Sequence, residues 1–582
     1  MSSRFIIIFC SIILFCCGCV NFDKHDIETD KISLASDFQV FLQGDLSSKT
    51  ALDLSKGSNK FPCESAKIKN DGNFIDFAKL AKVDKITHRQ AGIMLAQIHA
   101  EKEQLIYLGI GADWYFELYL NGELIYNCSQ GNLFAVAKNN YKIPLKVKKG
   151  ENLLALRVLS GSKGWGIFCN IVQNEVALSH IPWVVKSDIG SATINFMTNK
   201  AMAAFLEYRK EGEAGWIRLK NSKTGLLRTD TNLHVFELNN LLEDTVYEFR
   251  AVLAPDRHFN FEYPQKIYRF RSLGHKKDNY KLFLVGDTQI DSEDLKKTWD
   301  NFKKNTEINN CDFFVHIGDT ANFIGNAEEQ LLTSTLDILQ SERELLPNLI
   351  MVRGNHEYLG NEALKFVDFF GGKNGKNYYS FQAGKVFFIV LDSGCDHAYS
   401  KVKYHPFYAY LDDDALIQEQ RNFLREVVKK TDFQNSEFRV VLSHAPGVIP
   451  SRMTDTINKI CNGILWGEDI DNQIDLYVAG HTHRYCRSVQ KGSNAQRAFC
   501  REGILPLNDK TNKLIYIVND GPYTGKGLDI SGILFSFSNG KITVEAMDVN
   551  GKIFDHFEID KTGKITEIYT EIPLFTEGGI EK

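Results

Sequence analysis

The sequence predicts a multidomain protein in which two N-terminal β-sandwiches are followed by an α/β (α+β) layered domain. At 582 residues the chain is too long for one hydrophobic core and has room for about three to four domains. Up to about residue 275, short segments alternate apolar and polar residues, as half-buried strands do. From residue 280, apolar runs alternate with helical stretches, which indicates an α/β arrangement with ligand-binding loops at the strand ends.

Composition excludes two broad classes. Hydrophobic residues make up 43% of the chain and charged residues 24%, values typical of a globular protein and not of a disordered one. The formal net charge of -5 gives no electrostatic reason to expect nucleic-acid binding. The cysteines beyond Cys19 show no C-x-x-C spacing, so a thiolate metal site is not expected.

The N-terminus, residues 1–18, is typical of a lipoprotein-type signal peptide. Arg4 precedes an apolar core, Phe5 to Phe15, that is too short to span a bilayer as a mature helix. Gly18-Cys19 resembles a bacterial lipoprotein cleavage site, which implies lipidation of Cys19 and a membrane anchor in the bacterial cell envelope. Cys16 stands where an aliphatic residue is usual, so a plain signal peptide cut nearby is the alternative.

Residues 31–178 follow a predicted linker at 19–30 and are interpreted as the first β-sandwich. Asn121-Gly122 interrupts the alternating stretch "DWYFELYLNGELIY", where a two-residue hairpin turn is expected. The segment resembles the jelly-roll sandwich of galactose-binding-like modules, which would make a glycan a partner of this domain. Trp114 and Trp165 either stack on such a sugar or fill the sandwich core.

Residues 179–275 are interpreted as the second β-sandwich. Two pairs of short strands are expected in "SATINFMTNKAMAAFLEYR" and "HVFELNNLLEDTVYEFRAVL". Leu238, Leu241 and Tyr247 have the spacing of the tyrosine corner of fibronectin type III sandwiches. The segment therefore resembles a fibronectin type III domain, and we expect its role to be structural.

Five apolar segments of the last domain end in side chains of the kinds that bind metal ions. The segments are FLVGDTQ with Asp287 and Gln289, FFVHIGDTAN with Asp319 and Asn322, IMVRGNHEY with Asn355 and His356, RVVLSHAPG with His444, and LYVAGHTHRY with His481 and His483. Each alone has an ordinary explanation as turn chemistry or a buried histidine. Together, Asp, Asn, Gln and His without a thiolate suit Mn, Fe, Zn or Ni.

In this order the five segments match the calcineurin-like metallophosphoesterase family, whose pattern is D-x-H, GD, GNH[ED], a later His, and GHxH. The match covers about residues 287–483. It implies a four-layer domain over residues 280–560, with two sheets packed face to face between helices and a dimetal centre at the strand ends. Residues 561–582 would be a C-terminal tail.

The resemblance also implies a role for each motif residue. It implies a first metal ion held by Asp287, Gln289 and His483, and a second metal ion held by Asn355, His444 and His481. Asp319 would bridge the two ions. The reaction implied is hydrolysis of a phosphate ester by a metal-bridging hydroxide. His356 resembles the family's proton donor to the leaving oxygen.

Two positions depart from the family pattern. Gln289 stands where most members have histidine, and its amide oxygen would either ligate a metal more weakly or hydrogen-bond a bound water. Asn322 stands where purple acid phosphatases have the tyrosine that ligates Fe(III) and gives the colour. The fibronectin-like module before the catalytic domain is nevertheless similar to the purple branch. We therefore expect a colourless enzyme of purple-phosphatase-like architecture, with the Asn322 amide orienting His356 and with Asn322 among the candidate substrate contacts.

Three further side chains near the motifs are assigned less direct roles. Arg353 and Arg484 flank metal motifs, and each either clamps phosphate oxygens or forms salt bridges and packs. Asp392 is expected to shape the domain core and not to bind metal. The aromatic insert at 395–414 is either a lid that stacks a base or sugar, or a segment that packs on the fibronectin-like module.

The sequence thus predicts an exported, lipid-anchored dimetal phosphoesterase that acts on phosphate monoesters. One alternative is a phosphodiesterase or nucleotidase, for which the aromatic insert would stack the base. Another is a surface glycan-binding protein with an impaired phosphatase domain.

Overall fold

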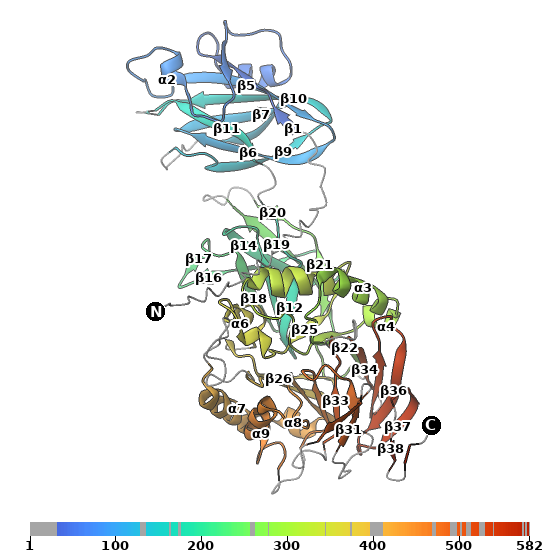
Figure 1. Ribbon diagram of the computed structural model, residues 1–582. Helices are drawn as coiled ribbons and strands as arrows, with labels where there is room; N and C mark the ends of the chain where they lie inside the picture. The colour runs from blue at the N-terminus through green and yellow to red at the C-terminus, as the bar shows by residue number, and fades with distance from the viewer. Residues whose placement is uncertain are drawn as a thin grey trace, which may run out of the picture. The chain divides into compact units, whose positions relative to one another are not determined.

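The computed structural model describes residues 32–580, with gaps at 129–135, 162–163, 173–175, 256–261, 278, 344, 373–374, 396–410, 468–472, 489–496, 501–502, 508–513, 523–529, 539, 573–574 and 577–578 (Figure 1). The predicted signal peptide, the linker and Cys19 lie outside the described residues. The chain divides into two compact units, the first ending at Glu175 and the second containing most residues from Val176 onward. No helix among the described residues is long and apolar enough to cross a membrane.

The first unit is an antiparallel β-sandwich. One sheet has the order β3-β2-β5-β10-β7-β8, with β1 also paired to β5, and the other has the order β4-β11-β6-β9. The strands are β1 Ile32–Leu34, β2 Asp37–Phe41, β3 Ala66–Lys69, β4 Ile75–Asp76, β5 Ala91–Ala100, β6 Gln104–Ala112, β7 Tyr115–Leu120, β8 Glu123–Asn127, β9 Tyr141–Val147, β10 Gly150–Leu159 and β11 Gly166–Val172. Apolar side chains of both sheets form one core between them. Helices α1 (Ser48–Ser55) and α2 (Phe77–Leu80) complete the unit.

The predicted hairpin turn of this sandwich is confirmed. Asn121 (φ 50°) and Gly122 (φ 87°) join β7 to β8, and both have the positive φ that a type I′ turn requires. Trp165 is only 1% exposed, and its indole N–H donates to the carbonyl oxygen of Val158 at 3.2 Å. Trp165 therefore fills the core, whereas Trp114 is half-buried.

The second unit contains two large sheets. The first has the order β18-β13-β12-β25-β23-β22-β34-β35-β36-β37 and the second β26-β27-β28-β29-β33-β30-β31-β32. Strands of the first are β12 Trp183–Asp188, β13 Ser191–Met197, β18 Leu233–Asn239, β22 Tyr280–Val285, β23 Phe313–His316, β25 Asn348–Met351, β34 Gly532–Ser538, β35 Lys541–Met547, β36 Ile553–Asp560 and β37 Ile565–Thr570. Strands of the second are β26 Tyr379–Ala383, β27 Val386–Leu391, β28 Phe438–Ser443, β29 Leu476–Ala479, β30 Cys486–Arg487, β31 Arg497–Cys500, β32 Gly503–Pro506 and β33 Tyr516–Val518.

The predicted four-layer arrangement is confirmed. A core of apolar side chains such as Leu284, Val315, Phe388 and Val440 lies between the two large sheets. A second core joins the outer face of the first sheet to helices, and a third does the same for the second sheet (Figure 1). The helices on the first sheet are α3 Ser292–Phe302, α4 Thr306–Asn309, the π-helix η1 Glu328–Leu336, α5 Asp337–Leu339 and α6 Lys365–Phe370. Those on the second are α7 Asp413–Val427, α8 Thr431–Asn435 and α9 Arg452–Cys461.

The segment predicted as a separate second sandwich, residues 179–275, belongs to this same compact unit. Three strands of this segment, β12, β13 and β18, belong to the first large sheet. Its other strands contribute to a smaller sheet with the order β15-β14-β19-β21-β24, in which β20 also pairs with β19. The short strands β16 and β17 form a separate pair. Both sheets continue into the catalytic segment, because β12 pairs with β25 and β21 pairs with β24. Strands on both sides of the boundary predicted after residue 275 therefore share these two sheets. The strands are β14 Ala203–Lys210, β15 Ile217–Lys220, β16 Ser222–Lys223, β17 Leu226–Leu227, β19 Val246–Ala254, β20 Tyr263–Pro264, β21 Tyr268–Arg271 and β24 Leu345–Leu346.

The tyrosine-corner prediction has a structural counterpart at Tyr247. Its hydroxyl oxygen accepts a hydrogen bond from the backbone N–H of Leu242 at 2.8 Å. Such a bond from a strand tyrosine back to the preceding loop is the defining feature of the corner. It fixes the chain where it enters β19.

The predicted C-terminal tail also differs from the structure. Residues Lys561 to Lys564 make a turn with Gly563 at φ 79°, and β37 then pairs with β36. Ile572 is 4% exposed and belongs to the core between the large sheets. The sheet therefore extends past residue 560, and only a short segment with β38 (Phe575–Thr576) and β39 (Gly579–Ile580) follows it.

His180 links the chain before β12 to the π-helix η1 and makes the stability of the second unit pH-dependent. Its ring nitrogens contact the carboxylates of Asp337 at 2.7 Å and Glu328 at 3.0 Å. Burial alone lowers the pKa of His180, but these two carboxylates raise it above its ordinary value. The charged ring then stabilises the fold fully below about pH 6.5, and this contribution disappears as pH rises through the raised folded pKa.

We therefore expect His180→Gln to lower the free energy of unfolding most at acidic pH, with the loss shrinking as pH rises. Denaturant unfolding of both proteins from about pH 5 to about pH 9 measures this difference. His556→Gln is the matched control, because His556 of β36 forms no ion pair within the part of the chain that the structure describes. A loss that is constant across this range would contradict the assignment.

Candidate metal centre

The candidate ligands lie at the carboxyl ends of parallel strands from both large sheets. Asp287 follows β22, Asp319 follows β23 and Asn355 follows β25, which are neighbours in the first sheet. His444 follows β28, and the His481/His483 pair follows β29, its neighbour in the second sheet. Because the sheets pack face to face, their ligand-bearing loops meet at one edge of the domain.

Asp319 is shared by two groups of side chains that could each hold a metal ion. In one group Asp319 joins His444 and His481, and in the other it joins Asp287 and His483, with ligand atoms within 4.8 Å of one another in each group. The Asp319 carboxylate lies 3.2 Å from His444 Nε2, and the Asp287 carboxylate lies 3.4 Å from His483 Nε2. This division is the one that the family resemblance implies.

The two amide ligands predicted from the sequence also face this cluster. Asn355 Oδ1 lies 3.1 Å from His444 Nε2, on the side of the second ion. Gln289 is half-buried, and its Nε2 donates to Asp319 Oδ2 at 3.3 Å. The Gln289 amide therefore lies next to the carboxylate of Asp319, the residue predicted to bridge the two metal ions.

Four of these ligands have a left-handed backbone conformation, which is uncommon for residues other than glycine. The φ angles are 51° at Asp287, 58° at Asp319, 72° at His481 and 52° at His483. Such conformations cost free energy and persist where the surrounding structure holds them, as at functional sites. They turn each side chain away from its strand and toward the common cluster.

Motif glycines allow the ligand loops to approach one another closely. A Cβ atom on Gly354 would lie 2.2 Å from Asp319 Oδ1, and one on Gly480 would lie 2.5 Å from Asp287 Oδ2. Any larger side chain at either position would displace a ligand carboxylate. The glycines of GNHE and GHTH are therefore required by packing at the site itself.

Glu357, the last residue of GNHE, holds the two loops of the first sheet together. Its buried carboxylate accepts hydrogen bonds from the backbone N–H groups of Asp319 (3.0 Å), Thr320 (2.6 Å) and Gly354 (2.8 Å), and from the Thr320 hydroxyl (2.6 Å). Similarly, buried His316 contacts the Thr288 hydroxyl at 2.8 Å. Burial lowers the pKa of His316 to about 3, so this ring is neutral.

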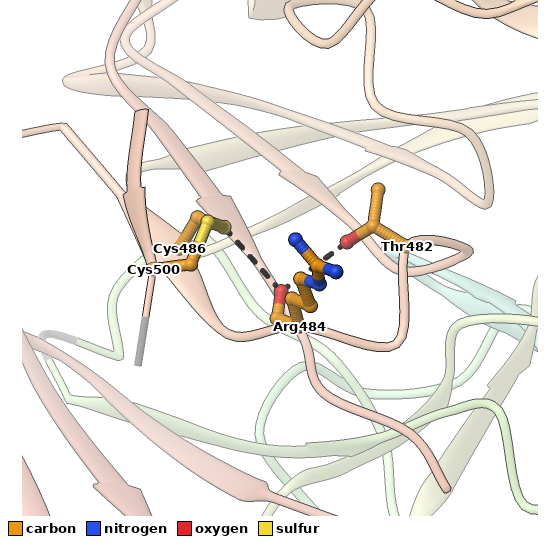
Figure 2. The surroundings of a disulfide bond; sticks show 4 residues. All are labelled: Thr482, Arg484, Cys486 and Cys500. Carbon is orange, nitrogen blue, oxygen red and sulfur yellow. Dashed lines mark hydrogen bonds between the residues drawn. A yellow bond between two sulfur atoms is a disulfide. The ribbon is translucent and has the colours of Figure 1, made fainter. Parts of the chain in front are cut away.

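Four contacts hold the loop that carries His481 and His483 and the strand that follows it. His483 Nδ1 donates to the carbonyl oxygen of Pro522 at 2.8 Å, which leaves Nε2 facing Asp287. A disulfide joins Cys486 to Cys500 directly after this loop, and the Thr482 hydroxyl donates to the Arg484 carbonyl within it (Figure 2). The strand that follows the loop, β30, is tied by buried Arg487 to a carboxylate of the first sheet.

The electrostatics of the cluster suit cations. Burial raises the pKa of Asp287 to about 6, with a further contribution from Asp319. Burial would lower the pKa of His444, but the carboxylates of Asp319, Asp287 and Glu357 raise it to about 10. A buried imidazole holds its proton this strongly only in a negative potential, which a bound metal ion would satisfy in the proton's place. The donor set therefore fits the metal ions predicted from the sequence.

His356 lies at the edge of the cluster, where it is partly open to solvent. Its Nδ1 donates to the backbone carbonyl oxygen of Asn322 at 2.7 Å, and its Nε2 lies 3.9 Å from Asp319 Oδ2. The side chain is 25% exposed. The prediction that the Asn322 amide orients this ring is therefore corrected, because the backbone of Asn322 makes the contact while its side chain is exposed.

The Arg353 side chain makes structural contacts outside the ligand cluster. Its guanidinium contacts Asp392 at 2.6 Å and donates to the Tyr358 hydroxyl at 2.7 Å. Asp392 is fully buried, accepts from that same hydroxyl, and shapes the core as expected. Of the two roles predicted for Arg353, these contacts agree with the salt bridge and not with the clamping of phosphate oxygens. The predicted phosphate contact of Arg484, which is half-buried beside His483, stays a prediction.

Several residues that support the ligands were not identified from the sequence. Glu357 stands inside the GNHE motif, so its position was visible but its role was not. The segment Asn519 to Pro522 follows β33 just as the other ligand loops follow their strands. An apolar strand ending in "NDGP" was the signal that could have identified it.

A comparison with protein families gives an independent assignment of the segment that carries the ligand motifs. Residues 280–485 match the model of the calcineurin-like phosphoesterase family. These residues form a calcineurin-like phosphoesterase domain. They contain every motif from which the resemblance was drawn, and the predicted enzyme class, a metal-dependent phosphoester hydrolase, is confirmed with it.

Solved structures similar to the chain include a purple acid phosphatase and PhoD. One is the purple acid phosphatase PPD1 from yellow lupin (Lupinus luteus) seeds, at 14% identity and a TM-score of 0.47, with 81% of this chain and 93% of that chain covered. Another is PhoD, at 11% identity and a TM-score of 0.42, with 70% of this chain and 93% of that chain covered. No curated protein matches the chain. The assignment of the phosphoesterase domain therefore rests on the family match and on the site.

Proposed function

We propose that the chain is an exported, lipid-anchored phosphatase that hydrolyses phosphate monoesters at a two-metal centre. The observation that carries this proposal is the Asp319 carboxylate, which is shared by two ligand groups. A carboxylate shared by two groups of imidazoles and acids is a donor arrangement that would hold two metal ions side by side. When bound, such ions polarise a phosphoryl oxygen and lower the pKa of an attacking water.

The residues of the chain prepare the site for this chemistry. Backbone and buried contacts hold the candidate ligands in place before any substrate arrives. These ligands are Asp287 and His483 on one side and Asn355, His444 and His481 on the other. Preorganised groups of this kind lower the barrier because they need not reorganise during reaction.

His356 has the geometry of a proton donor to the leaving oxygen. Its Nδ1 is fixed by the Asn322 carbonyl, so its Nε2 faces the cluster. In the imidazolium form this Nε2 carries a proton, and partial exposure allows the ring to regain that proton from solvent. His356 would thus give a proton to the leaving group as the ester bond to phosphorus breaks.

We expect His356→Ala to lower kcat for p-nitrophenyl phosphate by about 10²-fold or more, since general acid catalysis contributes about 10²–10⁴. Asn322→Ala should leave kcat within about threefold of wild type, because the backbone carbonyl that orients His356 remains. Metal content and hydrolysis of p-nitrophenyl phosphate and its bis-ester are measured on the same preparations. A preference for the bis-ester would support the phosphodiesterase alternative. Absence of turnover with added Mn, Fe, Zn or Ni would support the glycan-binding alternative.

Export and anchoring are supported by two features of different kinds. The Cys486–Cys500 disulfide suits an oxidising compartment, because cytosolic thiols are kept reduced. The N-terminal sequence has the apolar core and Gly18-Cys19 pair of a lipoprotein signal. We expect the full chain, expressed in a bacterium, to incorporate labelled palmitate and to fractionate with membranes. Cys19→Ala should lose both properties, and retained label in that variant would overturn the anchor.

A further inference from the structure

The two aspartate loops of the first large sheet are built alike. Residues 286–288 after β22 and residues 318–320 after β23 both read Gly-Asp-Thr. In both loops the aspartate has a positive φ and the threonine is at most 5% exposed. A buried side chain carried by the next strand contacts each threonine hydroxyl, His316 of β23 for the first loop and Glu357 after β25 for the second. Each loop is thus tied, through its threonine, to its neighbour in the sheet.

The hydrogen bonds of the His316 ring follow from its contact with the backbone. The Gly318 N–H donates to His316 Nδ1 at 3.3 Å. A backbone N–H can only donate, so Nδ1 is the unprotonated nitrogen and Nε2 carries the ring proton. Nε2 therefore donates to the Thr288 hydroxyl oxygen, 2.8 Å away. One ring thus fixes both the backbone before Asp319 and the side chain after Asp287.

Thr288 stands between Asp287 and Gln289, two candidate ligands of the first metal ion. Next to its bond with His316, the backbone N–H of Asp287 donates to the Gly318 carbonyl oxygen at 2.9 Å. The left-handed conformation of Asp287 costs free energy and persists only where the surrounding structure holds it. Because Thr288 is 1% exposed and His316 is fully buried, water cannot easily replace a lost bond between them. This bond is therefore a fixed point for the ligands on either side of Thr288.

We propose that His316 is a positioning residue for the first metal site and acts through Thr288. The inference rests on the two-metal centre of the proposed function and adds that the two ions depend on different supporting residues. Glu357 holds the loop of Asp319, which both ligand groups share. The bond from His316 to Thr288 holds the loop of Asp287, which belongs to one ligand group alone. Loss of that bond should therefore weaken the binding of one ion more than that of the other.

The test is calorimetric titration of the metal-free full chain with Mn²⁺, of which wild type should bind two ions. Thr288→Val keeps the shape of the side chain and removes its hydroxyl. It should lower the affinity for one ion by about 10- to 100-fold, as replacing a residue that orients a metal ligand typically does. Affinity for the other ion should change by less than about tenfold. Thr288→Ser keeps the hydroxyl and should restore most of the loss. At a Mn²⁺ concentration that fills both wild-type sites, electron paramagnetic resonance should show a coupled pair in wild type and a single bound ion in Thr288→Val.

A second variant removes the same bond from its other side. His316→Leu and Thr288→Val should not have additive effects, because two residues joined by one bond lose that bond only once. The double variant should therefore lose less affinity than the sum of the two single losses. Thr335→Val is the matched control, since the Thr335 hydroxyl of η1 is equally buried and donates to the Gln330 carbonyl oxygen at 3.0 Å. This control should lose stability and bind both Mn²⁺ ions as wild type does.

The inference would be wrong if Thr288→Val bound both ions like wild type or weakened both equally. Equal losses in Thr288→Ser and Thr288→Val, or additive losses in the double variant, would also overturn it. Thermal melting of the metal-free proteins shows which variants are folded, and His316→Leu keeps the test decisive if Thr288→Val is not. A wild-type chain that binds fewer than two Mn²⁺ ions would contradict the two-metal centre of the proposed function, and this inference with it.

Discussion

Asp319→Asn is expected to lower kcat/KM for p-nitrophenyl phosphate by about 10³-fold or more. Asp319 belongs to both groups of candidate metal ligands, so its replacement weakens both metal sites at once. Metal ions supply several kcal/mol of transition-state stabilisation in phosphoryl transfer, and each 1.36 kcal/mol corresponds to about tenfold in rate. The amide also lacks the negative charge that reduces repulsion between two cations. Metal analysis should find fewer than two ions per chain in this variant.

Asp392→Asn is the matched control for that result. Asp392 is another fully buried aspartate near the site, but its carboxylate pairs with Arg353 and belongs to neither ligand group. We expect this variant to lose stability and to keep its metal. Equal metal loss in both variants would show that the effect comes from disturbing the fold and not from removing a shared ligand.

The difference between these two aspartates shows what the sequence can predict about the site. Both follow apolar strands, and only the grouping of Asp319 with later motifs distinguished it. The match of the five segments to the family pattern predicted Asp287, Asp319, His444, His481 and His483 as one metal-binding cluster, and the structure brings them together. The residues that hold these ligands in position could not be predicted from the sequence. Glu357 and Pro522, for example, come next to Asp319 and His483 only through the fold.

The fold was predicted best where local chemistry decides the structure. The Asn121-Gly122 turn and the apolar strands follow from backbone preference and burial, and both are found. The pairing of β12 with β25 joins Val184 to Asn348, residues far apart in the chain. No periodicity specifies that pairing, so residues 179–275 were assigned to a separate domain. Long-range strand pairing is the part of a fold that local pattern does not contain.

One such long-range contact connects the second sheet to the first directly after the His481/His483 loop. Arg487 of β30 and Asp555 of β36 are both buried, with Nε to Oδ2 at 2.6 Å and Nη2 to Oδ1 at 3.1 Å. The Tyr485 hydroxyl donates to the same carboxylate at 2.9 Å. The contact also packs the guanidinium over the Phe557 ring at 4.3 Å. It is thus a fully desolvated ion pair with its hydrogen bonds satisfied.

Asp555→Ala is expected to lower the free energy of unfolding of the second unit by about 3–5 kcal/mol, because it removes the closest partner of the buried Arg487 charge. Denaturant unfolding followed by tryptophan fluorescence measures this loss. Glu567, whose carboxylate lies 3.5 Å from Arg487, keeps the effect toward the lower end of that range. Metal affinity should fall as well, because β30 loses its tie to β36 and the preceding ligand loop loses a fixed end.

The double variant Arg487→Met/Asp555→Leu separates the two consequences. Replacing a buried ion pair with apolar side chains of similar volume often restores stability, so the double variant should recover most of the loss of Asp555→Ala. Metal affinity should recover with it if apolar packing fixes the end of the loop as well as the ion pair does. Recovered stability with weak metal binding would instead show that the directed hydrogen bonds position His481 and His483. An Asp555→Ala protein as stable as wild type would contradict the burial of an uncompensated charge, and with it the contact between the two sheets at this point.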